Sequence, residues 1–179
     1  VNAAFLANYQ SQFSKGYKYL DDGGKNLLSN FMAPGYLLVS LGFDYAPAQG
    51  LSIFVSPVTS RWVFVMNDSL SAIGSYGVEP GKHVKNEIGA FASITYNKKF
   101  TSNISYMGKL DLFSNYKHNP QNVDLLMNNM FTFQISKVLA ANLGLDLIYD
   151  DDVKLFGKNN DSPGMQIKQV IGVGLSIKL

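Results

Sequence analysis

Apolar and polar residues alternate along most of the chain, whereas the 3.6-residue spacing of an amphipathic helix is nearly absent. Strict alternation is typical of a β-strand whose two faces meet different surroundings. Eight segments show the pattern, at residues 1–13, 36–46, 51–67, 86–97, 103–114, 123–137, 141–150 and 165–179. The sequence therefore predicts an all-β protein with about eight antiparallel strands.

The segment 141–150 shows the two faces most clearly. Leu143, Leu145 and Leu147 fall on one face, and Asn142 and Asp146 fall on the other. Strands in ordinary domains average about 5 to 6 residues, whereas tilted membrane strands need about 9 to 11. The predicted segments are about 10 to 17 residues long. Their length favours strands that span a membrane.

The segment 51–67 contains an irregularity at Pro57. Proline has no N–H for the strand ladder, so we expect a β-bulge across Pro57 and the three residues after it. Beyond the bulge two alternatives stay open. The apolar face continues either through Trp62 and Phe64 or through Val63 and Val65.

Short and long connections alternate between these segments. The short ones are residues 46–50, 97–101 and 136–139. The long polar ones are residues 14–35, 68–85, 115–122 and 151–164. Outer-membrane barrels have short periplasmic turns and long outer loops. The pattern predicts an antiparallel up-and-down transmembrane β-barrel with the C-terminus on the short-turn side.

Composition agrees with this fold without deciding it. The 179 residues suit a single domain. Charged residues make up 16%, below the roughly 25% of soluble domains, and aromatic residues make up 13%. The balance of 15 Lys and Arg against 13 Asp and Glu gives no reason to expect nucleic acid. The absence of cysteine excludes disulfides and thiolate chemistry.

We expect the polar face to line the lumen. Ionisable residues of both signs occur at strand centres, which would suit a crowded interior. Tyrosines near strand ends on the apolar face would suit an interfacial belt. They are Tyr9, Tyr45, Tyr96 and Tyr149. The predicted lumen network consists of Asp44, Glu87, Lys109, Asp111, Asp146 and Lys168. Ion pairs between its acidic and basic members would plug a narrow barrel, so we predict no wide pore.

Several short motifs resemble a Bacteroidetes outer-membrane β-barrel family of unknown function, DUF3078. Residues 29–36 (SNFMAPGY) are similar to its SNF-x-AP-x-Y segment. Further matches occur in order at 51–57 (LSIFVSP), 74–81 (GSYGVEPG), 110–116 (LDLFSNY), 119–124 (NPQNVD), 147–152 (LIYDDD) and 166–175 (QIKQVIGVGL). The resemblance implies a bacterial outer-membrane location, a signal peptide and further strands before Val1, with about twelve strands in all. The chain would then be the C-terminal portion of a longer barrel. Leu179 departs from the aromatic residue that usually ends such barrels.

Two histidines, His83 and His118, fall in predicted outer loops. Ser114 and Asp111 are near His118 in sequence, so a hydrolase at the rim of the barrel is an alternative. No second feature supports catalysis, and solvated loop histidines are the preferred interpretation.

Residues 150–152 are three aspartates that resemble a hard-cation site, but their spacing is not that of an EF-hand. Residues 21–25 (DDGGK) lack the spacing of a phosphate-binding loop and are interpreted as a flexible turn. Residues 74–81 predict a structured loop over the barrel mouth, and Tyr76 within it is the best candidate for ligand contact. No metal or other cofactor is expected.

The leading functional hypothesis is a non-enzymatic outer-membrane barrel. It would act as a small channel, a structural protein or an accessory subunit of an envelope assembly. Its partners would be the lipid bilayer and lipopolysaccharide, with other outer-membrane proteins as further candidates. The alternatives are a soluble barrel that binds a hydrophobic ligand, with Leu143, Leu145 and Leu147 pointing inward, and an outer-membrane hydrolase.

Overall fold

The computed structural model describes residues 1–21, 23–151, 153–156 and 162–175. Eight long strands form one sheet: β1 (Asn2–Ser11), β4 (Gly35–Ala48), β5 (Leu51–Phe64), β6 (Val84–Lys99), β7 (Ile104–Asn115), β8 (Val123–Gln134), β9 (Leu139–Tyr149) and β12 (Gln166–Leu175). Two short hairpins and two helical turns lie in the long connections. They are β2 (Gly16–Tyr19) with β3 (Lys25–Ser29), β10 (Lys154–Phe156) with β11 (Ser162–Pro163), α1 (Asp68–Ala72) and η1 (Ser75–Gly77).

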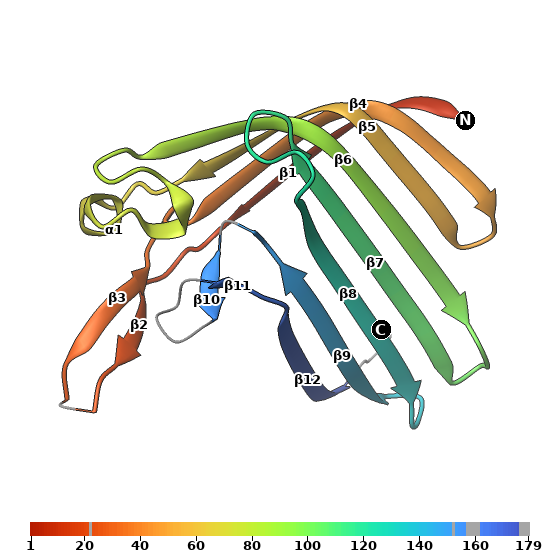
Figure 1. Ribbon diagram of the computed structural model, residues 1–179. Helices are drawn as coiled ribbons and strands as arrows, with labels where there is room; N and C mark the ends of the chain where they lie inside the picture. The colour runs from red at the N-terminus through yellow and green to blue at the C-terminus, as the bar shows by residue number, and fades with distance from the viewer. Residues whose placement is uncertain (22, 152, 157–161, 176–179) are drawn as a thin grey trace. The chain divides into compact units, whose positions relative to one another are not determined.

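The eight long strands form an antiparallel meander in the order β1-β4-β5-β6-β7-β8-β9-β12. Each corresponds to one of the eight segments that the alternation predicts, so the all-β, antiparallel part of the prediction is confirmed. The predicted positions of Ser176, Ile177, Lys178 and Leu179 in the last strand lie outside the described residues. In Figure 1, β7, β8, β9 and β12 lie side by side in this order.

The prediction of a closed barrel is wrong for the part of the chain that the structure describes. There, β1 and β12 are the outer strands of the sheet and do not pair with each other. Alternation and strand length report the two faces of each strand. They carry no information on whether the first strand hydrogen-bonds to the last, so the pattern could not predict closure.

The chain forms two compact units. Unit 1 consists of residues 1–4, 42–57 and 90–179, and unit 2 consists of residues 5–41 and 58–89. Unit 1 contains the continuous ladder of β7, β8, β9 and β12. Unit 2 contains the β2–β3 hairpin, α1 and η1.

In unit 1 the two faces of the ladder differ in chemistry and in exposure. Tyr106, Phe131, Leu143 and Ile171 are paired directly across four strands, on what we call the apolar face. Leu143 is 42% exposed and Ile171 is 81% exposed. The opposite side, which we call the polar face, carries the carboxylate of Asp146, whose side chain is only 25% exposed. The apolar side chains are therefore on the open side of these strands.

Burial along β5 resolves the alternative left open at Pro57. Phe54 and Ser56 are buried before this residue, and Thr59 and Val63 are buried after it. The buried positions thus change from even to odd numbers across two consecutive exposed residues, Pro57 and Val58. The expected irregularity is present, and Val65 (0% exposed) shares the buried side with Val63, so Trp62 and Phe64 occupy the other side. The carbonyl of Pro57 accepts a 2.8 Å hydrogen bond from the hydroxyl of Tyr116.

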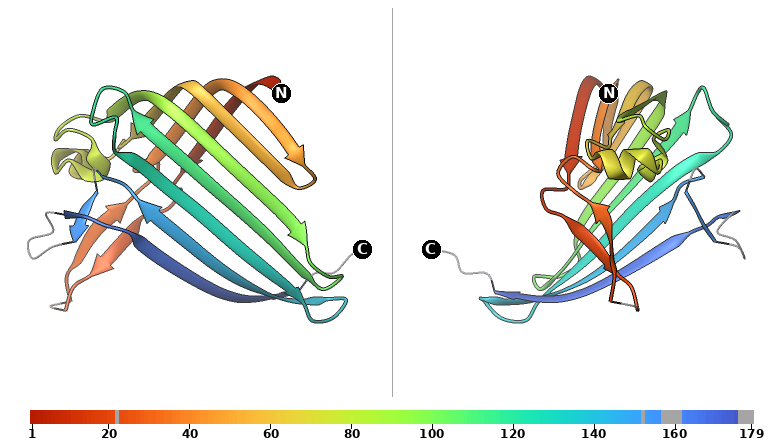
Figure 2. Two further views of the ribbon diagram at one scale, coloured as in Figure 1. Left: turned by 45° about the vertical axis from the view of Figure 1, so that its right-hand side comes forward. Right: turned by 90° about the vertical axis from the view of Figure 1, so that its left-hand side faces the viewer.

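Unit 2 has a small apolar core where the connection between β5 and β6 folds back. Five residues with 6% exposure or less form it: Ala33, Val63, Val65, Leu70 and Val78. The Asn67 side chain caps α1 by accepting a hydrogen bond from Leu70 N–H, and α1 lies beside β3 (Figure 2). None of the helices in the described part of the chain has the length and apolarity needed to cross a membrane.

Candidate functional site

A row of polar side chains crosses four strands of unit 1. Lys109 on β7 lies opposite Asn128 on β8, Asn128 lies opposite Asp146 on β9, and Asp146 lies opposite Lys168 on β12. The Asn128 amide donates to the Asp146 carboxylate over 3.0 Å, and Lys168 Nζ is 3.6 Å from the same carboxylate. Because the side-chain period of a strand is two, this register places all four residues on one face, and a slip of one residue would move a strand's member of the row to the other face.

A second acidic group extends the row toward β6. Lys109 Nζ donates to Asp111 over 2.7 Å, and the Ser93 hydroxyl donates to Asp111 over 2.6 Å. Two lysines thus face two aspartates, so the cluster has no net formal charge. Charge-assisted hydrogen bonds are stronger than neutral ones. We infer that this row, which we call the polar row, stiffens the sheet and does not present a free charge to a ligand.

Large apolar side chains share the polar face of unit 1. The rings of Phe54 and Phe91 are both 7% exposed and lie 6.2 Å apart, and Phe113 is 4% exposed. The Asp44 carboxylate accepts a 2.8 Å hydrogen bond from Ser52. Phe91 shares a face of its strand with Ser93, and Phe113 shares a face with Asp111, so the pattern of polarity did not predict their burial. The polar face is partly filled by packed side chains.

Glu87 lies in unit 2, apart from the other predicted members of the network. Its carboxylate is 3% exposed, 2.6 Å from Arg61 Nε and 3.0 Å from Lys85 Nζ. The alternation of the sequence did not predict Arg61 as a partner of Glu87. Arg61 comes directly after the irregularity in β5, and only the assignment of Trp62 to the opposite side places it with Glu87. In the same unit the Thr59 hydroxyl donates to Ser40 over 2.8 Å.

Aromatic residues gather near the short turns on the apolar face. Tyr106 lies with its ring centroid 6.2 Å from that of Tyr96 and 4.8 Å from that of Phe131, which contacts Phe133 in turn. The Tyr106 hydroxyl donates to Asn129 over 2.7 Å, and the Asn129 amide donates to the Leu145 carbonyl. The side-chain amide of Asn129 is therefore hydrogen-bonded through both its oxygen and its nitrogen.

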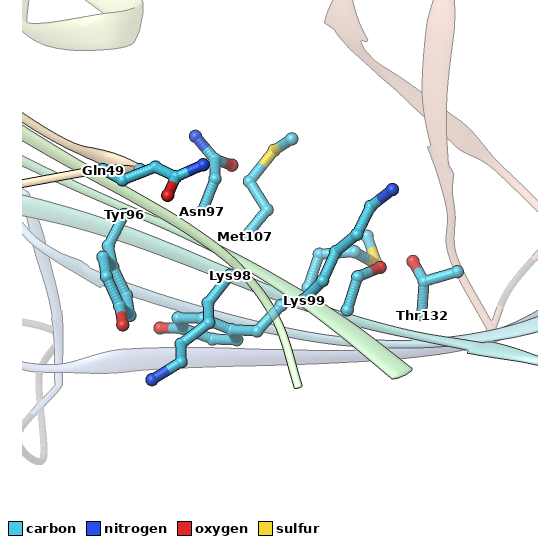
Figure 3. Close-up of a pocket in the computed structure, with 11 residues that line it drawn as sticks. Gln49, Tyr96, Asn97, Lys98, Lys99, Met107 and Thr132 are labelled. Atoms are coloured by element: carbon cyan, nitrogen blue, oxygen red, sulfur yellow. The ribbon is translucent and has the colours of Figure 1, made fainter. Parts of the chain in front are cut away.

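A depression of about 770 Å³ lies at this short-turn end of unit 1. Its wall includes Gln49 and Gly50 of the β4–β5 turn and Asn97, Lys98 and Lys99 of β6. The Asn97 N–H donates to Gly50 over 2.8 Å. Gly50 has φ +81°, and an added Cβ would lie 2.1 Å from the Asn97 carbonyl oxygen, so this turn requires glycine. In Figure 3, Tyr96 and Lys98 point to one side of β6, and Asn97 and Lys99 point to the other.

Tyr76 connects the loop 74–81 to β3. Its hydroxyl donates a 2.5 Å hydrogen bond to the Leu28 carbonyl in β3, and its backbone is left-handed, with φ 60°. Burial raises the pKa of the Tyr76 phenol above its ordinary value, so the hydroxyl stays protonated and able to donate. The loop is structured, as predicted. The structure gives Tyr76 a role in holding it, and contact with a ligand stays a prediction.

The residues considered for hydrolysis have other contacts. The Ser114 hydroxyl donates to the Pro120 carbonyl over 2.7 Å, and Asp111 belongs to the polar row. His83 Nδ1 lies 2.8 Å from the Val65 carbonyl, and its Nε2 is 3.6 Å from Asp68. His118 lies in the β7–β8 connection, as predicted. The structure provides no nucleophile–base pair among Ser114, Asp111 and His83.

The aspartates at 150–152 are described only in part, because Asp152 lies outside the described residues. Asp151 accepts a 2.5 Å hydrogen bond from the Asn122 amide, and the Tyr149 hydroxyl is 3.4 Å from it. In the part of the chain that the structure describes, no group of three or more His, Cys, Asp or Glu side chains could hold a metal ion. The segment 21–25 lies between β2 and β3, where Leu20 N–H donates to the Gly24 carbonyl, and Asp22 within it lies outside the described residues.

Comparisons with protein-family models, with curated proteins and with solved structures found no match to this chain. A function for this chain is therefore inferred from the geometry of its own residues. The family resemblance of the short motifs stays a prediction.

Proposed function

We propose that this protein is a non-enzymatic β-sheet protein of the bacterial outer membrane, with the apolar face in contact with lipid. One observation carries the proposal: the apolar-face side chains Leu143 and Ile171 of β9 and β12 are 42% and 81% exposed, whereas the carboxylates of Asp111 and Asp146 are paired with lysines on the other face. Leu145 is 36% exposed, while the neighbouring Asp146 is 25% exposed and contacts Asn128 and Lys168. A soluble barrel would have the opposite arrangement.

The same geometry favours a structural or accessory role over an open channel. The charges of the polar row are paired, and Phe54, Phe91 and Phe113 are buried on the same face. A face filled in this way leaves little room for a water column. Lipid bilayer and lipopolysaccharide are the proposed partners, with other outer-membrane proteins as a further class.

In hydrocarbon the outer strands β1 and β12 would need hydrogen-bond partners, because an unpaired backbone group there costs several kcal/mol. The proposal therefore includes that both edges are paired in the membrane, so that the sheet becomes part of a closed barrel. β12 supports this requirement: of its apolar-face residues, Ile167, Val173 and Leu175 are 62% to 75% exposed.

Fractionation tests the proposal. The chain is expressed in a Gram-negative host behind a signal peptide of that host, and membranes are washed with alkaline carbonate before detergent extraction. We expect recovery only in the detergent-extracted outer-membrane fraction. Recovery in the soluble periplasm without detergent would exclude the membrane function and favour the soluble, ligand-binding alternative.

A further inference from the structure

The charged side chains in the short turns of unit 1 are all positive. Residues 97–103 and 135–138 contain Lys98, Lys99 and Lys137, and neither these segments nor residues 46–50 contain an acidic residue. The 13 acidic residues of the chain all lie within strands or in the long connections. This end therefore carries an uncompensated positive charge, which favours an anionic surface.

The same turns expose apolar side chains beside these lysines. Phe100 is 53% exposed, Ile135 is 60% exposed and Val138 is 47% exposed. The turns are held by their own hydrogen bonds, such as Ile104 N–H to Thr101 Oγ1 and Leu139 N–H to Ser136 Oγ. Apolar groups next to lysines on an ordered turn suit the boundary between hydrocarbon and headgroups.

Lys98 and Lys99 are adjacent in sequence, but their side chains point to opposite sides of β6. Figure 3 shows Lys98 on the side of Tyr96, and Lys99 on the side of Asn97. Lys98 Nζ lies 5.7 Å from the centroid of the Phe100 ring, and Tyr96 contacts Tyr106 in the aromatic cluster. The Lys98 side therefore combines a cation with the end of an apolar, aromatic surface.

We propose that Lys98 and the Tyr96 hydroxyl bind the phosphate of an anionic phospholipid headgroup, whose acyl chains lie along the aromatic cluster of the apolar face. This inference rests on the proposed membrane function and adds a lipid class and a site to it. The Lys98 ammonium supplies the charge for the phosphate oxygen, and Tyr96 supplies a neutral donor. The Tyr106 hydroxyl already donates to Asn129 and contributes its ring.

The test uses the full chain in dodecyl maltoside micelles and short-chain phosphatidylglycerol as the probe. Its binding is measured from the rise in the thermal unfolding midpoint. One lysine near an anionic membrane surface contributes about 1 kcal/mol, a fold-change of about five. We expect Lys98→Gln to weaken the apparent affinity about fivefold and Lys98→Arg to keep it. Lys99→Gln is the matched control, and we expect less than a twofold change.

Two further arms identify the ligand. Phosphatidylcholine of the same chain length should stabilise less than phosphatidylglycerol, and inorganic phosphate should not compete at equal concentration. Equal losses in Lys98→Gln and Lys99→Gln, or full competition by inorganic phosphate, would overturn the inference. If the protein fractionates with membranes but the Lys98→Gln variant binds phosphatidylglycerol as well as the wild type does, only this lipid site is refuted. A protein recovered in the soluble fraction refutes the proposed function itself.

Discussion

Asn128 on β8 lies directly opposite Asp146 on β9, and its amide nitrogen donates a 3.0 Å hydrogen bond to the Asp146 carboxylate. The neutral amide of Asn128 lies between Lys109 and Asp146. The positive charge nearest to the Asp146 carboxylate in this row is that of Lys168 on the next strand. In the polar row no two like charges are therefore direct neighbours. Direct neighbours of like charge would destabilise the sheet.

The Asn128–Asp146 contact should appear as a coupling energy. We predict that the double variant Asn128→Ala, Asp146→Ala loses less unfolding free energy than the sum of the losses in the two single variants. The difference should be about 0.5–1 kcal/mol, the range of a cross-strand polar pair. The measurement is a double-mutant cycle of urea unfolding in micelles. Glu79→Gln is the control, because both partners of its contact with Lys82 are solvent-exposed and the substitution should change the stability little. Strictly additive costs would show that the row does not act as a unit.

Adjacent residues on β9 should differ in their tolerance of charge. We predict that Leu145→Arg makes membrane insertion less favourable by about 2–4 kcal/mol, because the charged side chain would enter hydrocarbon. Asp146→Arg places the same group on the polar face and should reduce insertion by less than about 1 kcal/mol. The inserted fraction after refolding into lipid vesicles measures both. Equal tolerance at positions 145 and 146 would argue against a lipid-facing apolar face.

Glu87 should matter more to stability than either of its cations. Glu87→Ala leaves Arg61 and Lys85 together without their shared carboxylate, and breaking such a buried pair typically costs about 3–5 kcal/mol. Arg61→Ala leaves Lys85 in place at 3.0 Å, so we predict a smaller loss. Urea unfolding of the two variants gives the order. A larger loss for Arg61→Ala would show that packing of the guanidinium dominates.

Tyr76→Phe should loosen the connection between β5 and β6. The variant loses the hydrogen bond to Leu28 and should cost about 1 kcal/mol. Hydrogen exchange over residues 68–83 should accelerate, while exchange in β8 stays unchanged. Tyr19→Phe is the control, because Tyr19 is 76% exposed, and we expect no change in exchange there.

The same bond predicts a pH dependence. Burial raises the pKa of Tyr76, and a folded pKa above the unfolded one gives stability that is complete below the unfolded pKa, about 10 for tyrosine. This stability is lost as the pH rises through the raised folded pKa. The advantage of the wild type over Tyr76→Phe should therefore be constant at neutral pH and disappear in strong alkali. An advantage that declines between pH 6 and 8 would assign the effect to another group.

Alternation predicted the strands because each has two chemically different sides. It placed Leu143 and Leu145 against Asp146 correctly, and it placed Asn128 on the side of the polar row. It could not reveal Arg61 as the partner of Glu87, because a single irregularity at Pro57 exchanges the two sides for every residue that follows. The burial of Phe91 and Phe113 among polar neighbours depends on which side chains fit together in space, which polarity alone does not encode.

The connections were harder to predict than the strands. The β2–β3 hairpin and α1 are only a few residues long, and too short for a periodic pattern. Their positions depend on contacts such as Leu70 with Val65 and on the Asn67 cap, which are decided by the fold. The 74–81 loop was predicted from its turn-forming residues. The role of Tyr76 in it depends on Leu28, which is 48 residues earlier in the chain.

The irregularity at Pro57 determines how substitutions along β5 should be interpreted. The buried positions are even-numbered in residues 51–56 and odd-numbered in residues 59–65, and we expect these positions to be the ones that tolerate substitution least. A tolerance map of this strand would therefore reverse its phase midway. If the tolerance were averaged over the whole strand, the two-residue periodicities of its two halves would cancel. β5 would then look like a segment without a buried face, although each half has one.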